Sequence, residues 1–225
     1  MNSFSLARRL AAEAVGSAFL LAVVVGSNLM GERLSGGDPA MTLLAASLAT
    51  GAVLFVIISM FGGISGAHFN PAVTLGFLIR RQISGGDAGL YVVAQTAGAL
   101  VGVVVAHLMF ELPPVVSADV ARPGANQWLG EFIATFGLVA AIFLCLRFRP
   151  EMVGAAVGLF IGAGYWFTIS TSFANPAVTL ARMVSAGPAG IDASFVPGFI
   201  AAQLAGAAAA ALFCAWIVRD DPAQT

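Results

Sequence analysis

The sequence predicts an all-α membrane protein in which six transmembrane helices and two re-entrant half-helices form an inverted repeat. Three observations predict this fold. Hydrophobic residues make up 59% of the chain and charged residues only 9%, with a mean hydropathy of +0.94. Such values are far from those of soluble proteins. Apolar stretches long enough to cross a bilayer recur along the chain, and one five-residue motif, Asn70–Thr74, returns unchanged as Asn175–Thr179.

The apolar stretches give the order of the elements. A span needs about 20 apolar residues, and windows of this kind lie near residues 10–30, 41–62, 88–110, 127–146, 151–172 and 195–218. Two shorter segments, 71–81 and 176–186, follow the second and fifth windows. About ten helical residues rise roughly 15 Å, half the thickness of a hydrocarbon core of about 30 Å. These segments are therefore expected to be half-helices that meet within the membrane.

The two halves of the chain resemble each other beyond the motif. Glu13 in the first span corresponds to Glu131 in the fourth, and Ala94-Gln95 in the third corresponds to Ala202-Gln203 in the sixth. Three spans per half is an odd number, so the halves must lie inverted in the membrane. We expect a single channel domain over residues 1–225, with one repeat at about 8–110 and the other at about 127–218.

The arginines predict the orientation, because the chain contains no lysine. One side of the proposed topology carries Arg8, Arg9, Arg80, Arg81, Arg147, Arg149 and Arg219, and the other carries Arg33, Arg122 and Arg182. By the positive-inside rule, both termini are expected to be cytoplasmic. The expected location is a bacterial inner (plasma) membrane, crossed several times, with the lipid bilayer as surroundings.

Each copy of the repeated motif is a strong helix start. Asn suits the N-cap, where its side-chain oxygen accepts an N–H, and Pro suits the first helical position. Two such starts at the bilayer midplane bring together two partial positive charges and several N–H donors. Cations are disfavoured there, whereas a small neutral solute rich in oxygen is accepted. Backbone exposed at that depth indicates a water-filled pore.

The segment Ser65–Thr74 resembles the first signature of the aquaporins, the major intrinsic proteins, and the resemblance covers essentially the whole chain. It implies the aquaporin fold, a homotetramer with one pore per subunit, and passive flow of water or small uncharged solutes. It also implies that the pore motifs are formed by Asn70, Pro71, Ala72, Asn175, Pro176 and Ala177.

The second motif departs from the family pattern at one position. Val178 stands where most members carry an Arg that forms part of an outer selectivity filter. Counting without gaps, the other three filter positions resemble Thr50, Ala163 and Ser172. A slip of a few residues in the fifth span would bring in Tyr165 or Trp166 instead of Ala163.

The four assigned filter residues are small and uncharged, so we expect a wider and less selective mouth without the usual charged donor fork. Val in the Arg position resembles the bacterial aquaglyceroporin branch linked to arsenic resistance. That resemblance implies neutral arsenical hydroxides, such as arsenite, and methylated arsenicals as cargo beside glycerol-like polyols.

Four further residues are candidates for the scaffold or the vestibule. Ionisable groups inside spans are functional candidates by default, and we expect Glu13 and Glu131 to hold the re-entrant loops rather than to relay protons. His68 is expected to line the cytoplasmic vestibule, with gating as an alternative. Arg182 lies one helical turn beyond Val178, so it either restores a charged filter or extends into the outer vestibule.

No nucleophile–base pair, phosphate loop or metal-ligand spacing occurs in the sequence, so an enzyme, a cofactor, a metal and a nucleic-acid partner are not expected. Three alternatives stay open. The first is an ordinary water or glycerol facilitator. The second is an ion-coupled secondary transporter, because such proteins also use inverted repeats and broken helices. The third is a junction or scaffold protein with little transport.

Overall fold

The computed structural model describes residues 4–219 as a bundle of long helices that encloses two short ones. The first half of the chain forms α1 (Leu6–Ser35), α2 (Pro39–Ser65), α3 (Pro71–Ile79) and α4 (Gly85–Met109). The second half forms α5 (Ala125–Phe148), α6 (Val153–Phe167), α7 (Pro176–Ala181) and α8 (Val196–Ile217). Short 3-10 turns lie at Pro150–Met152, Arg182–Val184, Gly187–Ala189 and Ala193–Phe195.

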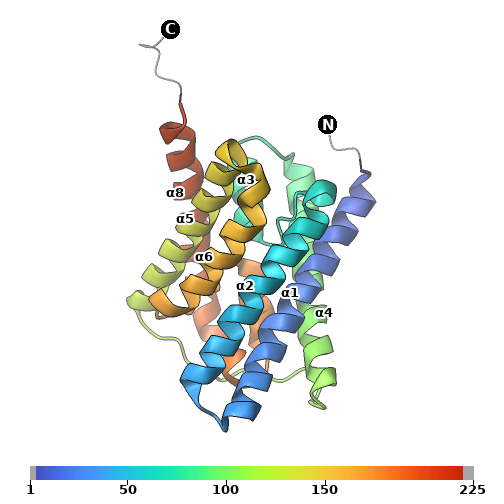
Figure 1. The fold of residues 1–225 in the computed structure, drawn as a ribbon, viewed down its shortest axis with the longest axis vertical. Coiled ribbons are helices and arrows are strands. Elements are labelled where there is room, and N and C mark those ends of the chain that lie inside the picture. Colours follow the sequence, from blue (N-terminus) through green and yellow to red (C-terminus); the bar gives the residue numbers. More distant parts are fainter. Residues whose placement is uncertain (1–3, 220–225) are drawn as a thin grey trace.

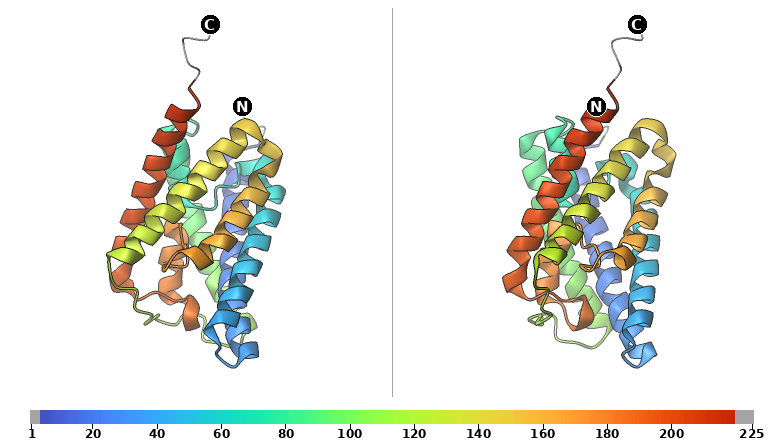
Figure 2. Two further views of the ribbon diagram at one scale, coloured as in Figure 1. Left: turned by 60° about the vertical axis from the view of Figure 1, so that its left-hand side comes forward. Right: turned by 90° about the vertical axis from the view of Figure 1, so that its left-hand side faces the viewer.

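The helices pack in the same way in both halves. Helix α1 packs against α2 and α4, while α5 packs against α6 and α8, and the halves meet where α2 contacts α6. Each half-helix crosses to the other side of the bundle, since α3 lies against α8 and α7 lies against α4. The start of α1 and the end of α8 lie at the same end of the bundle (Figure 1), and Figure 2 shows α3 and α7 surrounded by the long helices.

Five helical segments among the described residues are long and apolar enough to cross a membrane. The remaining predicted span, α6, is a helix of 15 residues that follows a 3-10 turn. It ends at Phe167, earlier than the predicted window, because the chain there turns inward toward the second motif. The second half-helix is also shorter than predicted and ends at Ala181, so that Arg182 begins a 3-10 turn.

Small residues allow the long helices to touch along their backbones. A Cβ atom added to Gly98 or Gly102 of α4 would collide with the carbonyl oxygens of Ala14 or Ala18 of α1. In the same way, a Cβ on Gly51 of α2 would lie 2.8 Å from the carbonyl oxygen of Gly158. Close backbone contact of this kind replaces the hydrophobic driving force that is missing between helices in lipid.

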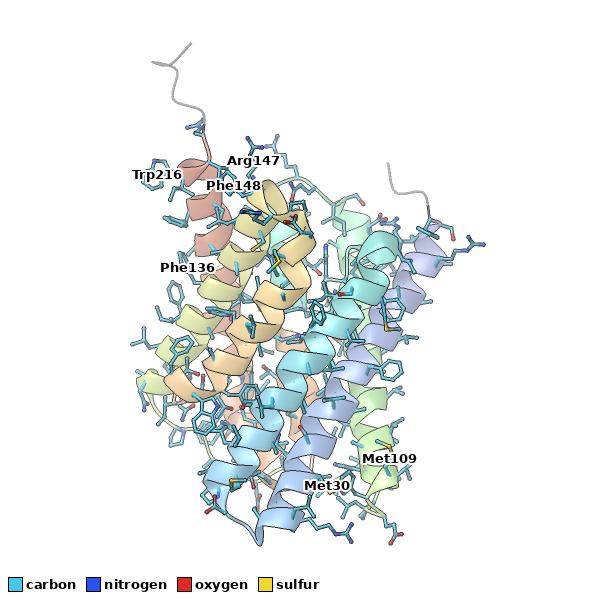
Figure 3. All side chains as sticks on the ribbon, in the orientation of Figure 1. Met30, Met109, Phe136, Arg147, Phe148 and Trp216 are labelled. Atoms are coloured by element: carbon cyan, nitrogen blue, oxygen red, sulfur yellow. The ribbon has the colours of Figure 1, made fainter. Side chains whose placement is uncertain are left out.

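The outer surface of the bundle is apolar. Large hydrophobic side chains such as Phe136 and Trp216 project away from the helix axes (Figure 3). Arg147 and Phe148 lie at the end of the bundle where α1 starts, whereas Met30 and Met109 lie near the opposite end. This surface fits a hydrocarbon environment, and it leaves the polar side chains of the interior to form the site.

Candidate transport passage

The two repeated motifs start their half-helices with the same cap. The Oδ1 atom of Asn70 accepts a hydrogen bond from the backbone N–H of Ala72 at 2.8 Å. The Oδ1 atom of Asn175 accepts from Ala177 at 2.9 Å and from Val178 at 3.3 Å. Both asparagines have φ of −158° and are followed by proline at the first helical position. The sequence thus fixes both helix starts locally.

The two caps are also bonded to each other's loops. The Nδ2 atom of Asn70 donates to the carbonyl oxygen of Ala174 at 2.7 Å, and that of Asn175 donates to the carbonyl oxygen of Phe69 at 2.8 Å. One amide hydrogen of each asparagine is therefore used within the protein. Only the second amide hydrogen of each asparagine remains for a solute. The two motifs together therefore offer two side-chain N–H donors instead of four.

The loops before the motifs hold strained backbone at matching positions. Phe69 and Ala174, which directly precede the asparagines, have φ of 48° and 49°. Ala67 and Ser172, two residues earlier, have φ of 51° and 49°. Each non-glycine residue in this left-handed region costs roughly 1–2 kcal/mol, so the loops must be held by other contacts. Strain of this kind often marks functional loops.

Glu13 of α1 supplies those contacts in the first repeat. Its carboxylate accepts from the backbone N–H of His68 at 3.0 Å and of Phe69 at 2.7 Å. It also accepts from the Ser65 hydroxyl at 2.6 Å and from the Gln95 side chain at 2.8 Å. Four donors therefore surround a fully buried carboxylate. These contacts are the ones that a scaffold role requires, because a buried charge is stable only when its oxygens are hydrogen-bonded.

Glu131 of α5 repeats the arrangement in the second half. It accepts from the backbone N–H of Phe173 at 2.9 Å and of Ala174 at 2.8 Å, and from the Gln203 side chain at 2.6 Å. Gln203 also donates to the Thr179 hydroxyl of α7 at 2.8 Å. Each carboxylate thus joins a long helix, the loop before the motif and, through a glutamine, the half-helix itself.

A glycine on α1 receives the side chain of Phe69. A Cβ atom at Gly16 would occupy the position of the Phe69 ring. The ring is 2% exposed and also packs edge-on against Phe61, with the centroids 6.1 Å apart. The notch at Gly16 therefore fixes the residue whose carbonyl oxygen binds Asn175.

A narrow cavity runs along the half-helix starts. Its volume is about 60 Å³, which exceeds the roughly 10–15 Å³ that a single water molecule requires. Most lining side chains are apolar and come from both repeats. The lining consists of Leu20, Val24, Thr50, Leu54, Ile58, Ala67, His68, Phe69, Asn70, Val73, Leu138, Ile142, Val157, Ile161, Tyr165, Ser172, Phe173, Asn175, Val178 and Arg182.

Three of the four predicted filter residues lie on this cavity, and the fourth does not. Thr50, Ser172 and Val178 line it. Ala163 is exposed on the outer face of α6 and lines a separate apolar groove between α2 and α6. Tyr165 takes its place, because its hydroxyl and that of Thr50 lie 3.1 Å apart at the cavity wall. The gap-free count failed here because Ala163 lies on the exposed face of α6, whereas Tyr165 lies on the face that lines the cavity.

His68 lies between the cavity and a second pocket of about 560 Å³ beside the start of α1, and lines both. Its Nδ1 atom is 3.1 Å from the Thr74 hydroxyl, and its ring stacks on Phe77 with the centroids 4.3 Å apart. The side chain is only 8% exposed. These contacts hold the imidazole against the wall and leave the inner end of the passage beside it.

Arg182 lies at the other end of the cavity. It is 3% exposed, and its guanidinium stacks on the Phe173 ring, 3.5 Å from the centroid. Its Nε atom donates to the carbonyl oxygen of Ala189. The side chain therefore does not extend into solvent. The four small filter residues predicted an uncharged mouth, but Arg182 places a positive charge at this end of the passage.

Arg122, from the loop before α5, is a second buried cation at this end and was not singled out from the sequence. Its guanidinium is 4.7 Å from the Phe173 centroid and donates to the carbonyl oxygens of Gly190, Ser170 and Pro188 at 3.2–3.4 Å. Burial lowers the pKa of Arg122 to about 10, so the group stays charged at neutral pH. Arg122 joins three segments that surround the outer end.

The comparison with known proteins decides the family. A model of the family described as Major intrinsic protein matches residues 1–165. The chain belongs to the major intrinsic protein family. It is 48% identical over 219 residues to Aquaglyceroporin AqpS of Rhizobium meliloti (strain 1021), with 97% of this chain and 94% of that protein covered.

More distant members give the same result. Aquaporin NIP1-4 of Oryza sativa subsp. japonica is 31% identical over 215 residues, which cover 93% of this chain and 76% of that protein. The X-ray structure of the aquaglyceroporin from Plasmodium falciparum superposes with a TM-score of 0.73 at 20% identity, covering 94% and 95% of the two chains. The structural likeness confirms the predicted fold class. As a major intrinsic protein, the chain is a multi-pass membrane channel and not an enzyme.

In this member of the family, several site residues were missed by sequence reasoning. Gln95, Gln203, Thr74 and Thr179 connect the carboxylates to the half-helices. The recurrence of Ala-Gln in both halves was a signal that could have found the glutamines. Within residues 4–219, no group of three or more His, Cys, Asp or Glu side chains is placed to bind a metal.

Proposed function

We propose that the protein is an aquaglyceroporin-type channel that passes small uncharged solutes down their gradients. The cargo comprises glycerol-like polyols, metalloid hydroxides such as arsenite, methylated arsenicals, and water. The observation that carries this proposal is Val178, which lines the passage at the position where most family members carry Arg. The 48% identity to a protein named Aquaglyceroporin AqpS supports the same class.

The filter in this proposal is formed by Thr50, Tyr165, Ser172 and Val178. Val178 corresponds to Val73 of the first motif, and both line the cavity. Neither valine carries a donor fork. A solute therefore keeps more rotational freedom than in a filter that carries Arg, and it is not restricted to one hydrogen-bonding geometry. Three of the four side chains are small, and the hydroxyls of Thr50, Tyr165 and Ser172 provide hydrogen bonds to oxygen-rich solutes.

In this proposal, cations are excluded where the starts of α3 and α7 meet. Asn70 and Asn175 place the starts of α3 and α7 at the passage, and each retains one amide hydrogen for the solute. A cation there meets donors and the positive ends of two helices, so entry costs free energy that a neutral molecule does not incur. Pro71, Ala72, Pro176 and Ala177 maintain this arrangement as the first helical residues.

Stopped-flow swelling of proteoliposomes tests the proposal. Glycerol and arsenite should enter faster than into empty liposomes, with water flow present as well. Brisk water flow with glycerol and arsenite flux no faster than in empty liposomes would leave only an ordinary water facilitator. Absence of all three fluxes would favour a scaffold protein.

The ion-coupled transporter is separated by its kinetics. A channel gives a flux that rises linearly with solute concentration, whereas a transporter saturates and responds to an ion gradient. The two buried carboxylates, Glu13 and Glu131, already accept four and three donors. Neither presents an unoccupied carboxylate to a coupling ion, which favours the channel.

We further propose a single channel domain in a bacterial inner membrane with both termini in the cytoplasm. The support is that α1 starts and α8 ends on the side where Arg147 lies (Figure 3). We also propose a homotetramer. The apolar groove between α2 and α6, with Ala163, Trp166 and Leu159 on its walls, is a surface that a neighbouring subunit would cover. Light scattering on the purified protein measures the subunit number.

A further inference from the structure

The guanidinium of Arg182 has one edge that no protein group occupies. Its Nε edge donates to Ala189, and its face lies on the Phe173 ring. Within residues 4–219, Nη1 and Nη2 donate to no protein acceptor, although Arg182 is only 3% exposed. Stacking leaves the N–H groups in the plane of the guanidinium free. Arg182 lines the passage, and its Nη atoms are not among the fully buried atoms without a partner, so we take this edge to face the passage.

Arg122 provides the internal comparison. It is buried to a similar degree and touches the same phenylalanine, but all of its nitrogens donate to backbone carbonyl oxygens. Arg122 is absent from the walls of the cavity and serves the loops. Two neighbouring arginines therefore have different tasks, and only Arg182 keeps donors unused.

Arg182 forms no direct ion pair, and the buried carboxylate of Glu131 acts on its charge only from a distance. No Asp or Glu oxygen of the described residues lies within 4.0 Å of either Arg122 or Arg182, because the ion pairs among these residues, Arg9–Asp87 and Arg149–Glu151, lie elsewhere. A buried guanidinium without a partner is costly unless an anion or several acceptors pair with it. The outer end of the passage therefore favours a solute that carries negative charge on oxygen.

The position of Arg182 is fixed before any solute arrives. Its carbonyl oxygen accepts from the backbone N–H of Ile191 at 3.2 Å, and the next residue, Met183, accepts from Ala118 at 2.9 Å. With Phe173 beneath the guanidinium and Ala189 at one edge, the fork has little freedom to lose on binding. A preorganised site of this kind retains more of its interaction energy.

We propose that Arg182 is a solute-binding residue that selects small oxyacids and their monoanions, which present two acceptor oxygens on one central atom. The proposal rests on the channel function above and adds to it a binding site at one end of the passage, where the charged form binds without being assigned to the uncharged cargo that passes. The planar fork of a guanidinium matches two such oxygens with parallel hydrogen bonds. The donor fork missing at Val178 is thus supplied from one turn further along the chain.

Calorimetric titration of the purified full-length protein tests the site without requiring transport. The probes are methanesulfonate, which is a monoanion with three oxygens on one sulfur, and dimethyl sulfone, which has the same shape but no charge. The variants are Arg182→Gln, Arg182→Lys and, as a matched control, Arg33→Gln, which removes a charge from an exposed position at the end of α1.

Methanesulfonate should bind the wild type and Arg33→Gln equally, and at least about tenfold more tightly than dimethyl sulfone, because charge-assisted bonds are the stronger ones. Arg182→Gln should weaken binding of methanesulfonate about tenfold or more. Arg182→Lys, which keeps the charge but not the fork, should fall in between. It also keeps the test valid if the glutamine variant fails to fold.

Unchanged methanesulfonate affinity in Arg182→Lys and Arg182→Gln would overturn the proposal, as would equal affinity for the two probes or no binding to the wild type. Glycerol swelling assays on the same preparations separate this result from the channel proposal. Glycerol flux without methanesulfonate binding rejects the Arg182 site alone, whereas binding without glycerol flux supports the site and rejects the solute class proposed above.

Discussion

The side-chain amide of Asn70 and the carbonyl oxygen of Ala174, from opposite halves of the chain, are joined by a hydrogen bond of 2.7 Å. The equivalent bond from Asn175 to Phe69 measures 2.8 Å. Together the two bonds tie each helix start to the strained loop of the other half. The asparagines therefore act as caps and as cross-links, and in the channel that we propose they would also donate to the solute, so that substitutions there affect all three.

Replacing Asn175 by Asp tests the exclusion of cations. The carboxylate can still cap α7, but it loses the bond to Phe69 and places a negative charge at the midplane. We expect sodium or proton permeability to rise by an order of magnitude or more, since about 1.4 kcal/mol corresponds to a tenfold change. A pH-sensitive dye in proteoliposomes measures the leak. Asn126→Asp, at an exposed position, should leave the liposomes tight, and equal leaks in both variants would contradict the explanation.

Glu13→Gln should destabilise the protein. Glutamine offers one acceptor oxygen where the carboxylate accepts four bonds, so buried donors are left unpaired. The expected cost is about 3 kcal/mol, because hydrogen bonds to charged groups contribute roughly 1.5–3 kcal/mol each. Thermal unfolding in detergent should show a lowered midpoint. Glu151→Gln, at an exposed position, is the control, and an equal midpoint for both variants would argue against the scaffold role.

Tyr165→Ala should widen the filter. The substitution removes a phenol that lines the cavity and contacts the Thr50 hydroxyl. Flux of a five-carbon polyol should rise several-fold relative to glycerol, a change that corresponds to roughly 1 kcal/mol. Ala163→Ser should have no effect on this ratio, because Ala163 faces the outer groove. A changed ratio in Ala163→Ser, with none in Tyr165→Ala, would place the filter at the position that the gap-free count assigned.

Val178→Arg should restore a donor fork and narrow the passage. Flux of glycerol and larger solutes should fall about tenfold while water flow survives, because water passes where a polyol does not. Val178→Met has a similar length without the charge, and it separates volume from hydrogen bonding. Equal glycerol flux through the wild type and Val178→Arg in swelling assays would show that the filter lies elsewhere.

Gly98→Ala should disturb the contact between α1 and α4. The added methyl group collides with the Ala14 carbonyl oxygen, so the helices must move apart, and overpacking costs about 1–3 kcal/mol. Gly89→Ala in the same helix meets nothing within 4 Å and should be neutral or slightly stabilising. Thermal midpoints of the two variants provide the comparison, and a loss in Gly89→Ala alone would refute the packing argument.

The fold could be predicted from the sequence because its signals are local or repeated. The apolar windows, the Asn-Pro helix starts and the two copies of the motif each follow from short-range chemistry. Glu13 and Glu131 could be assigned to the re-entrant loops because a buried carboxylate requires donors and these loops contain free N–H groups.

The outer end of the passage could not be predicted in the same way. The choice between Ala163 and Tyr165 depends on where α6 stops and which face it turns inward, and an all-apolar helix carries no periodic signal for that. The task of Arg122 depends on carbonyl groups from residues far away in the sequence. Such contacts form only when the loops are assembled.

The notch at Gly16 makes the position of the Asn175 cap depend on a residue that does not line the passage. Any larger side chain there would displace the Phe69 ring, and the carbonyl oxygen of Phe69, which accepts from Asn175, would shift with it. A larger side chain at position 16 would therefore require a smaller one at position 69. The first helix thus acts on the passage in two ways, directly through Leu20 and Val24 in its wall and indirectly through Gly16, which lies outside that wall.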